Sequence, residues 1–398
     1  MKPWWTPSRC APLILLYFIF QYVDASHFRG GIFMWKPTHN ENEVEITFRM
    51  AWRRSYSGYT YCDRSTIDQG SLVANLGYVV CFECQPGRWS WSWSASDINM
   101  GDTSFVCTDF SEQEDWTQGE KTFTFHFNNK VAEFGFTGNA WIDLVYGGGN
   151  WEMRTKVDLN VRVDTGLLNT SPTSAMPAIV RLQHGCNHNI TIPVYDQDND
   201  IIKCRWAKSA LSECGGVCSS FRNSWLYETC KIQYSAVYST GWYAAAIQIE
   251  DFVSENSTTP LSSIPLQFLV YVFQSTKQCQ SKPIFVLPTR QAGACVGIPV
   301  NSVWSEKIIA RSENGSISEI NTVSPTGVKK SQLSQYDNYV NYWYVNITWS
   351  PKRNQMGEHP FCYTASESDG LVSERICINL LVGGEFLCIR FADKFTVS

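Results

Sequence analysis

The residues best suited to chemistry in this sequence lie in an acidic turn, Asp-Gln-Asp-Asn-Asp, near the middle of the chain. Calcium takes about six to eight hard oxygen ligands, which carboxylates at this spacing can supply. A turn of this composition can also be held without an ion, because Asx side chains accept hydrogen bonds from nearby backbone amides. We prefer the ion-free turn and keep calcium as the second interpretation, with no other cofactor indicated. The candidate calcium ligands are Asp196, Asp198, Asp200, Glu250 and Asp251.

Three tryptophans at alternate positions, Trp89, Trp91 and Trp93, share one face of a predicted strand. Indoles in a row can stack on sugar rings or interleave with arginines. Aromatic residues on one strand face usually pack inward, so a core position is the first interpretation. The same face is the candidate binding site if the protein is a lectin.

A second metal-like spacing, His184 and His188 around Cys186, is better explained by a disulfide, because a closed zinc site would need a further ligand from elsewhere. The sequence contains no Gly-x-Ser-x-Gly elbow, no His-Glu-x-x-His helix and no Walker loop. We therefore predict a protein that is not an enzyme.

Residues 1–25 are typical of a secretory signal peptide. Lys2 and Arg9 precede an apolar run at 11–20, and Ala25 supplies a small residue for cleavage. The run is shorter than the ~20 residues that a membrane span needs, and no later segment is long enough to span a membrane. The predicted location is secreted and extracellular.

Removal of the leader takes Cys10 and leaves 14 of the 15 cysteines in a chain bound for an oxidising compartment. The spacing leaves the pairing of the first four cysteines open, and it leaves Cys186 and Cys388 without an assigned partner. The pairs that we expect in the middle of the chain are Cys204 with Cys230 and Cys214 with Cys218. The cysteines expected in disulfides are Cys62, Cys81, Cys84, Cys107, Cys186, Cys204, Cys214, Cys218, Cys230, Cys279, Cys295, Cys362 and Cys377.

Asn-x-Ser/Thr sequences in a secreted chain are acceptors for N-glycans. In the strand around Asn346, Val345 and Ile347 lie on the core face, which leaves Asn346 pointing to solvent. The predicted glycosylation sites are Asn169, Asn189, Asn256, Asn314 and Asn346.

The chain is acidic, with a formal net charge of −5 and 17% charged residues, which argues against a nucleic-acid surface. Its aromatic content of 14% supplies large apolar side chains for thin sandwich cores. The expected partner is an extracellular protein or glycan.

Hydrophobic and polar residues alternate over several stretches, which predicts half-buried antiparallel strands. One such stretch runs from Trp151 through Val161 to Val163, with Arg162 on the solvent face. A Ser/Thr/Pro-rich segment with no apolar period predicts a linker. The predicted organisation is a signal peptide (1–25), a Trp-rich N-terminal β domain (26–165), a linker (166–177), a β-sandwich (178–275), a second β-sandwich (276–383) and a tail (384–398).

An internal repeat supports the two sandwiches. Arg181–Cys186 is echoed by Arg290–Cys295 at an offset of 109 residues, and Gly241 by Gly357 at an offset of 116. Both offsets suit a sandwich-sized unit. Where the acidic turn aligns, the second copy keeps a single acid, Glu306, which favours a turn that needs no ion.

The acidic turn before a strand, and Gly241-Trp-Tyr before Glu250-Asp251, resemble the skeleton of cadherin-like and other immunoglobulin-like tandem repeats of extracellular animal proteins. The resemblance covers about residues 178–383. The predicted fold class is all-β, with tandem antiparallel β-sandwich domains that are immunoglobulin-like or cadherin-like and disulfide-bonded. We expect a non-enzymatic adhesion, matrix or recognition protein. The alternatives are a carbohydrate-binding lectin that uses Trp89–Trp93 and a secreted hydrolase.

Overall fold

The computed structural model describes residues 28–82, 84, 97–313, 315–336 and 339–383. The predicted leader, the Trp89–Trp93 face, Asn314 and Cys388 lie outside these ranges. Within them the protein is nearly all β, as predicted, with one short α-helix, α1 (Arg64–Gln69). No helix in this described part of the chain is both long and apolar enough to cross a membrane.

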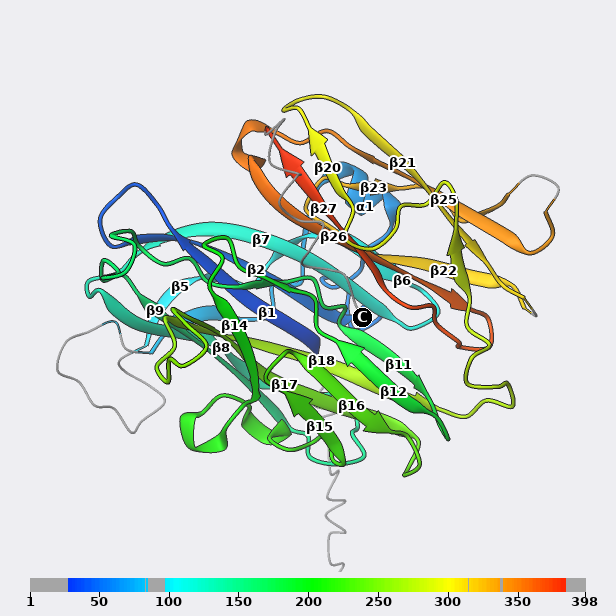
Figure 1. Cartoon of the computed structure of the whole chain (residues 1–398), viewed down its shortest axis with the longest axis horizontal. Helices are drawn as coiled ribbons and strands as arrows, with labels where there is room; N and C mark the ends of the chain where they lie inside the picture. The colour runs from blue at the N-terminus through cyan, green and yellow to red at the C-terminus, as the bar shows by residue number, and fades with distance from the viewer. Residues whose placement is uncertain (1–27, 83, 85–96, 314, 337–338, 384–398) are drawn as a thin grey trace, which may run out of the picture.

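The largest sheet has 13 strands and is the frame of the molecule (Figure 1). Its main path, in sheet order, is β3 (Leu72–Val73), β6 (Phe105–Ser111), β7 (Trp116–His126), β2 (Glu43–Arg53), β1 (Phe28–Pro37), β18 (Ser262–Phe273), β9 (Asn150–Asp158), β8 (Val131–Asn139), β4 (Tyr78–Cys81) and β5 (Ile98–Asp102). The other members are β11 (Ile179–Gln183), β14 (Ile201–Trp206) and β17 (Gly241–Phe252).

Strand β18 joins the parts of this sheet. One of its edges pairs along its length with β17, and the other pairs in turn with β9, β1 and, in parallel, β11. The approach of β1 requires a glycine, because a Cβ on Gly30 would lie 2.4 Å from the carbonyl oxygen of Gln267 and the φ of Gly30 is +141°. β18 therefore belongs to the same sheet as strands far from it in sequence.

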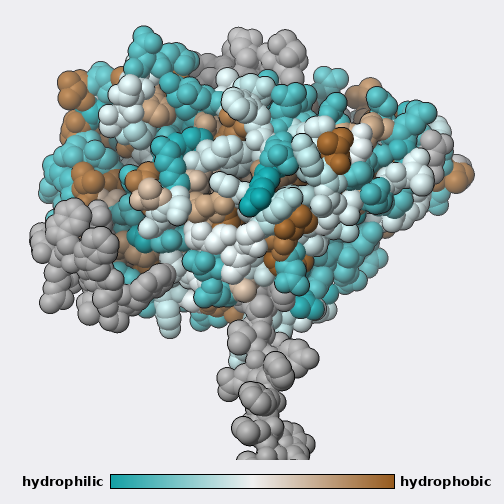
Figure 2. All heavy atoms as spheres, turned by 90° about the horizontal axis from the view of Figure 1, so that it is seen from below, coloured by the Kyte–Doolittle hydropathy of each residue, from teal (hydrophilic) through white to brown (hydrophobic). Residues whose placement is uncertain are grey.

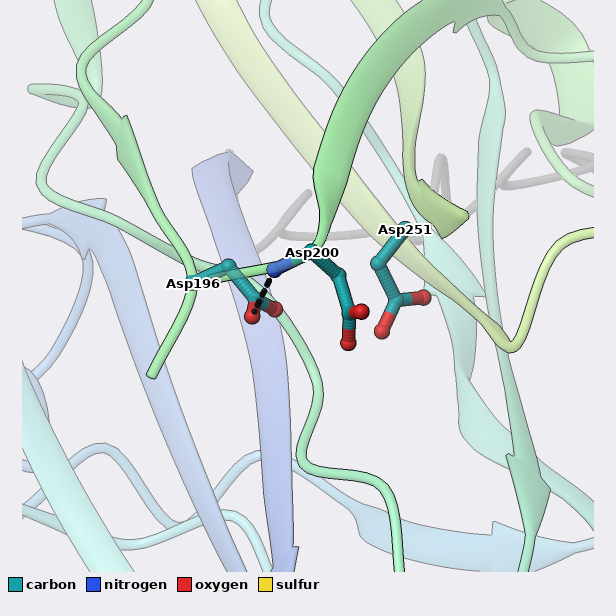
Figure 3. A group of neighbouring side chains, drawn as sticks. All are labelled: Asp196, Asp200 and Asp251. Carbon is teal, nitrogen blue, oxygen red and sulfur yellow. Dashed lines mark hydrogen bonds between the residues drawn. The ribbon is translucent and has the colours of Figure 1, made fainter. Parts of the chain in front are cut away.

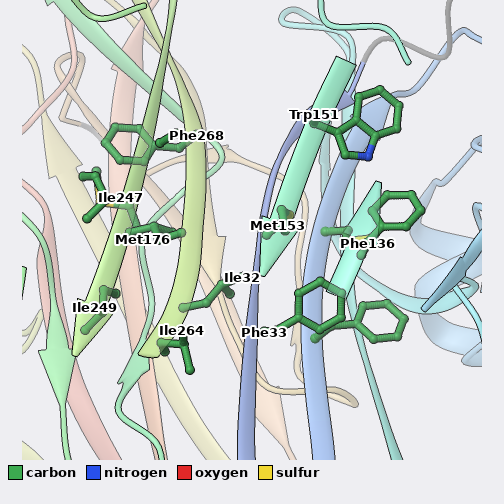
Figure 4. Packing of buried hydrophobic residues seen from close by; sticks show 14 of the residues in the cluster. Ile32, Phe33, Phe136, Trp151, Met153, Met176, Ile247, Ile249, Ile264 and Phe268 are labelled. Carbon is green, nitrogen blue, oxygen red and sulfur yellow. The ribbon is translucent and has the colours of Figure 1, made fainter. Parts of the chain in front are cut away.

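One hydrophobic core extends from β1 to β18. In Figure 4, Ile32 of β1 points toward Ile264, whereas Phe33 points to the opposite side, toward Phe136. β1 is thus buried on both faces, as its continuous Ile-Phe-Met-Trp run requires. The predicted linker, residues 166–177, connects parts of this one core. The division of the chain into independently folding domains stays a prediction.

The 13-stranded sheet and two small sheets together are called the larger body below. One contains β10 (Thr173–Ser174) and β13 (Val194–Tyr195), and the other contains β12 (Asn187–Thr191), β16 (Lys231–Ser235) and β15 (Ser224–Tyr227).

Residues 284–382, called the third unit below, form a sandwich with its own core, drawn yellow to red in Figure 1. Val345, Ile347 and Trp349 are buried there and Asn346 is exposed, as the alternation predicted. One sheet contains β19 (Ile284–Val286), β21 (Trp304–Arg311), β25 (Tyr342–Trp349), β23 (Lys329–Lys330) and β24 (Ser334–Gln335). The facing sheet contains β20 (Cys295–Ile298), β27 (Ile376–Val382), β26 (Gly357–Glu367) and β22 (Ile317–Val323).

The topology of the two repeated segments is alike. In each, an antiparallel hairpin ends in a strand that also has a parallel partner: β17–β18 with β11, and β26–β27 with β20. The aligned Gly241 and Gly357 begin β17 and β26, and both have positive φ. The repeat that the sequence predicts is therefore present in the fold.

A buried ion pair joins the third unit to the larger body. Asp109 on β6 is fully buried and accepts two hydrogen bonds from Lys330 Nζ, at 2.6 and 2.7 Å. It also accepts from the backbone N of Thr322 at 2.7 Å and from Thr322 Oγ1 at 2.9 Å. Ser111, two residues along β6, donates to Glu319. These contacts fix β6 against β22.

Six disulfides link cysteines that both lie in the described ranges. The predicted pairs Cys204–Cys230 and Cys214–Cys218 are confirmed. Cys186, left unassigned by the sequence, pairs with Cys279 across the predicted boundary at 275–276. Cys295 is also disulfide-bonded. The remaining pairs are Cys62–Cys107, Cys81–Cys84 and Cys362–Cys377.

Candidate functional site

Three of the five predicted calcium ligands converge. Asp196 and Asp200 belong to the turn between β13 and β14, and Asp251 lies near the end of β17. The antiparallel register of β14 and β17 places Ile202 opposite Asp251, which brings that carboxyl group beside the turn. One carboxylate oxygen from each of the three lies within 4.8 Å of the others (Figure 3). We call these three residues the carboxylate cluster.

The structure does not bring Glu250 into the cluster, contrary to the sequence prediction. Neighbouring residues on a strand point to opposite faces, so Glu250 turns away from Asp251. Its carboxylate lies 2.8 Å from Arg205 Nη2 and accepts a hydrogen bond from Ser263. Glu250 is therefore engaged elsewhere.

Asp198 lies at the rim of the cluster. Its Oδ2 accepts hydrogen bonds from the backbone N and the Oγ1 of Thr170, at 2.6 and 2.7 Å. The same oxygen is 3.9 Å from Arg162 Nη1. Asp198 thus ties the turn to the segment that follows β9.

Arg162 borders the carboxylate cluster, although the sequence analysis did not include it among the site residues. The alternation placed Val161 and Val163 in the core and Arg162 in solvent, but β9 ends at Asp158 and the alternation does not continue beyond it. Val161 is 58% and Val163 104% exposed, whereas Arg162 is 8% exposed. The inward position of Arg162 had one signal in the sequence. The carboxylates of the acidic turn need a positive counter-charge, and a nearby arginine can supply it.

The guanidinium of Arg162 contacts two carboxyl groups at once. It donates to Asp164 at 2.8 and 3.1 Å, and to both oxygens of Asp200, one of them at 2.6 Å. These hydrogen bonds raise the pKa of Arg162 above its usual value. The arginine therefore stays charged and orients Asp200.

Asn169 connects Arg162 to Asp251. Its Oδ1 accepts from Arg162 Nη1 at 2.9 Å, and its Nδ2 donates to Asp251 Oδ2 at 2.7 Å. Asn169 is 2% exposed, so its amide nitrogen is not available for a glycan in the folded chain. This burial argues against a glycan at Asn169, because a sequon carries no information on burial, and occupancy at this position stays a prediction. Among the other predicted acceptors, Asn189, Asn256 and Asn346 are exposed.

Asp196 combines the predicted turn with an unpaired oxygen. Its Oδ1 accepts from the backbone N of Asp200 at 3.0 Å, which is the Asx hydrogen bond expected of an ion-free turn. Its Oδ2 is buried and accepts no hydrogen bond from the part of the chain that the structure describes, and the residue is 3% exposed. Burial, together with the charges of Asp251 and Asp200, raises the pKa of Asp196 to about 7.

The environment of Asp251 also disfavours its charged form. Burial raises its pKa, although hydrogen bonds from Ser262 and Asn169 act in the other direction. Ser262 donates to Asp251 Oδ1 from its backbone N at 2.7 Å and from its Oγ at 2.6 Å. The cluster therefore carries an excess of negative charge in a buried place, where a proton or a cation relieves it.

The two other candidate sites from the sequence are the His184–His188 spacing and the Trp89–Trp93 face. His184 and His188 each hydrogen-bond a backbone carbonyl oxygen through Nε2, at 2.7 and 2.8 Å, and Cys186 between them forms a disulfide. These three residues are therefore held by structural contacts. The indoles of Trp89, Trp91 and Trp93 lie outside the described residues.

Comparison with known proteins identifies relatives. Residues 29–160 match a family model described as "Integrin beta-like protein A-E, N-terminal". Over 93% of this chain the sequence is 22% identical to integrin beta-like protein C of Dictyostelium discoideum, and over 49% it is 25% identical to integrin beta-like protein A of the same organism. The chain spans at most about a fifth of the length of these curated relatives, 20% for protein C.

Solved structures give weaker likenesses. The sialic acid binding region of a Streptococcus sanguinis adhesin covers 54% of this chain and 78% of its own, at 10% identity and a TM-score of 0.21. Fibronectin(III)-like modules of Clostridium thermocellum cover 53% of this chain and 94% of their own, at 16% identity and a TM-score of 0.19.

Proposed function

We propose that this protein is an extracellular, non-enzymatic adhesion or recognition protein that binds a protein or glycan partner. The observation that carries the proposal is the match of residues 29–160 to the N-terminal family model of integrin beta-like proteins. The alignment with integrin beta-like protein C extends this likeness over 93% of the chain. The cadherin-like resemblance of residues 178–383 agrees with such a role and stays a prediction.

The disulfides support the extracellular location. Disulfides persist in oxidising compartments and are rare in the cytosol. The Cys186–Cys279 bridge joins residues 93 positions apart, and Cys62–Cys107 joins residues 45 apart, so both bridges link distant parts of the chain and need an oxidising environment. The predicted signal peptide at residues 1–25 supplies the route of export.

Exposed aromatic side chains favour a glycan as one class of partner. Trp225 and Tyr227 on β15 are 64% and 45% exposed, and their rings lie 6.3 Å apart. Exposed aromatic faces of this kind stack on sugar rings in carbohydrate sites. On the face drawn in Figure 2, hydrophobic side chains are scattered among hydrophilic ones, so recognition there would depend on small groups of residues.

The test uses the chain secreted from eukaryotic cells with its disulfides intact. We expect cells to adhere to immobilised protein, and adhesion to be lost after reduction and alkylation. A glycan array on the same preparation separates the two partner classes. Trp225→Ala and Trp91→Ala should weaken a glycan signal, whereas Tyr59→Ala, at an exposed aromatic residue in another part of the molecule, should not.

Two results would contradict the proposal. One is a native chain that supports no more adhesion or array binding than the reduced chain. The other is peptide mapping without reductant that finds most thiols free, which would exclude the extracellular location.

A further inference from the structure

We propose that the carboxylate cluster, Asp196, Asp200 and Asp251, binds one calcium ion. The inference does not depend on the adhesion function. It depends on the geometry of the three side chains, on one unpaired oxygen, and on how the neighbouring positive charge is placed.

The geometry brings hard oxygen donors together from two separate elements. The turn supplies Asp196 and Asp200, and the end of β17 supplies Asp251, with one oxygen of each within 4.8 Å of the others (Figure 3). Each carboxylate oxygen has two lone pairs, so an oxygen that already accepts a hydrogen bond can still coordinate an ion. Two hydrogen bonds from Ser262 occupy Oδ1 of Asp251, whereas Oδ2 accepts only the one from Asn169 and keeps a lone pair for an ion.

The second observation is the unpaired oxygen of Asp196. Buried polar atoms in folded proteins nearly always have a partner, and an exception needs an explanation. Asp196 is 3% exposed, and its Oδ2 receives no hydrogen bond from any described residue. The Asx turn uses only Oδ1. The turn therefore accounts for the burial of Oδ1, and a coordinated cation accounts for the burial of Oδ2.

Arg162 does not fill this role. Its guanidinium contacts Asp164, Asn169 and both oxygens of Asp200, and each Asp200 oxygen accepts one of these hydrogen bonds and keeps a second lone pair. None of its hydrogen bonds reaches Asp196 or Asp251 among the described residues. Arg162 neutralises the rim of the site and holds Asp200 in position, which leaves the negative charge of Asp196 and Asp251 uncompensated.

Calcium fits this site better than magnesium. Calcium accepts irregular arrangements of oxygen ligands, whereas magnesium demands near-ideal octahedral geometry and keeps several waters. The donors here come from a turn and a strand end, and Asp198 lies at the rim. In the third unit the aligned position has only Glu306, which pairs with Arg290 at 2.8 Å. We therefore expect one site in the described part of the chain, in the larger body.

The experiment follows thermal unfolding of the full secreted chain after chelation and then with rising free calcium. A ligand that binds only the folded state raises the melting temperature steadily once its concentration exceeds the dissociation constant, and each tenfold rise lowers the unfolding equilibrium constant by about tenfold. Calorimetric titration of the same protein should give one calcium per chain. Magnesium at the same concentration should give a smaller shift or none.

Asp196→Asn is the decisive variant. It keeps the oxygen that accepts from the Asp200 amide and removes the charge, so the chelated variant should melt at or above the temperature of the chelated native protein. Its calcium shift should be lost. Glu41→Gln, at an exposed acid in the turn before β2, is the matched control and should keep the full shift.

Each other outcome overturns the inference. If calcium changes neither the melting temperature nor the heat of titration, the cluster holds no ion. If Asp196→Asn stabilises the protein while the native chain ignores calcium, Asp196 carries a proton. If the variant keeps the native calcium shift, the ion binds at another place, and an equal shift with magnesium would contradict the assignment to calcium.

Discussion

Replacing Lys330 with Met should loosen the third unit from the larger body. Lys330 Nζ donates to both oxygens of Asp109, which is 0% exposed, and also to the carbonyl oxygen of Ile320 at 2.8 Å. Methionine keeps most of the apolar length of the side chain and removes the charge. The carboxylate of Asp109 would remain buried, with only Thr322 and the backbone amide of Phe110 as donors.

The expected cost follows from the burial of Asp109. Removing one partner of a buried ion pair typically costs about 3–5 kcal/mol, because the other charge is left uncompensated in a low dielectric. Since about 1.4 kcal/mol corresponds to a factor of ten in an equilibrium constant, the population in which β6 and β22 have separated should rise by about two to four orders of magnitude. The adjacent residue provides the control. Lys329 pairs with Asp68 at 2.9 Å, but the two side chains are 51% and 57% exposed.

Lys329→Met should therefore change stability by no more than about 1 kcal/mol, as exposed ion pairs do. The assay is unfolding in urea with all disulfides intact, together with hydrogen exchange of the amides of β6 and β22. We expect Lys330→Met to lower the urea midpoint and to increase exchange in both strands. Lys329→Met should do neither.

Equal urea midpoints and equal exchange rates for Lys330→Met and Lys329→Met would contradict this prediction. That result would mean that Thr322 and the packing of β6 on β22 are enough to hold Asp109. A second check is Asp109→Asn combined with Lys330→Met. This pair removes both charges, so it should recover part of the stability that Lys330→Met alone loses.

Three further predictions concern single positions. Burial lowers the pKa of His188, so the stability that the neutral imidazole contributes is present above the ordinary pKa of 6.5 and is lost as the pH falls through the lower pKa of the folded state. In His188→Gln, the melting temperature should therefore depend less on pH between about 7 and 5. Gly30→Ala should destabilise by about 1–3 kcal/mol through backbone strain, whereas Gly58→Ala, where a Cβ meets nothing within 4 Å, should change unfolding free energy by less than ~1 kcal/mol. Glycopeptide mass spectrometry should find Asn346 occupied and Asn169 bare, and a glycan on Asn169 would contradict its burial.

Local alternation predicted many of the strands but not where each one ends, because a period of two residues sets only the faces of a strand. The core face around Val345 and Ile347 and the exposure of Asn346 follow from this period alone. The pair Cys214–Cys218 was also predictable, since both cysteines lie in one short loop. The composition of residues 196–200 predicted a turn, and its Asx hydrogen bond forms as expected.

Contacts between distant segments decided the rest. Arg162 points inward because Asp164 and Asp200 lie beside it, and the position of Asp200 depends on a turn 38 residues further along the chain. Asn169 is buried because Asp251 is near, although the two are 82 residues apart in sequence. Periodicity describes only which way a side chain points from its own strand. Which partner it meets is set by the sheet order, and here that order depends on β18 returning between β1 and β9.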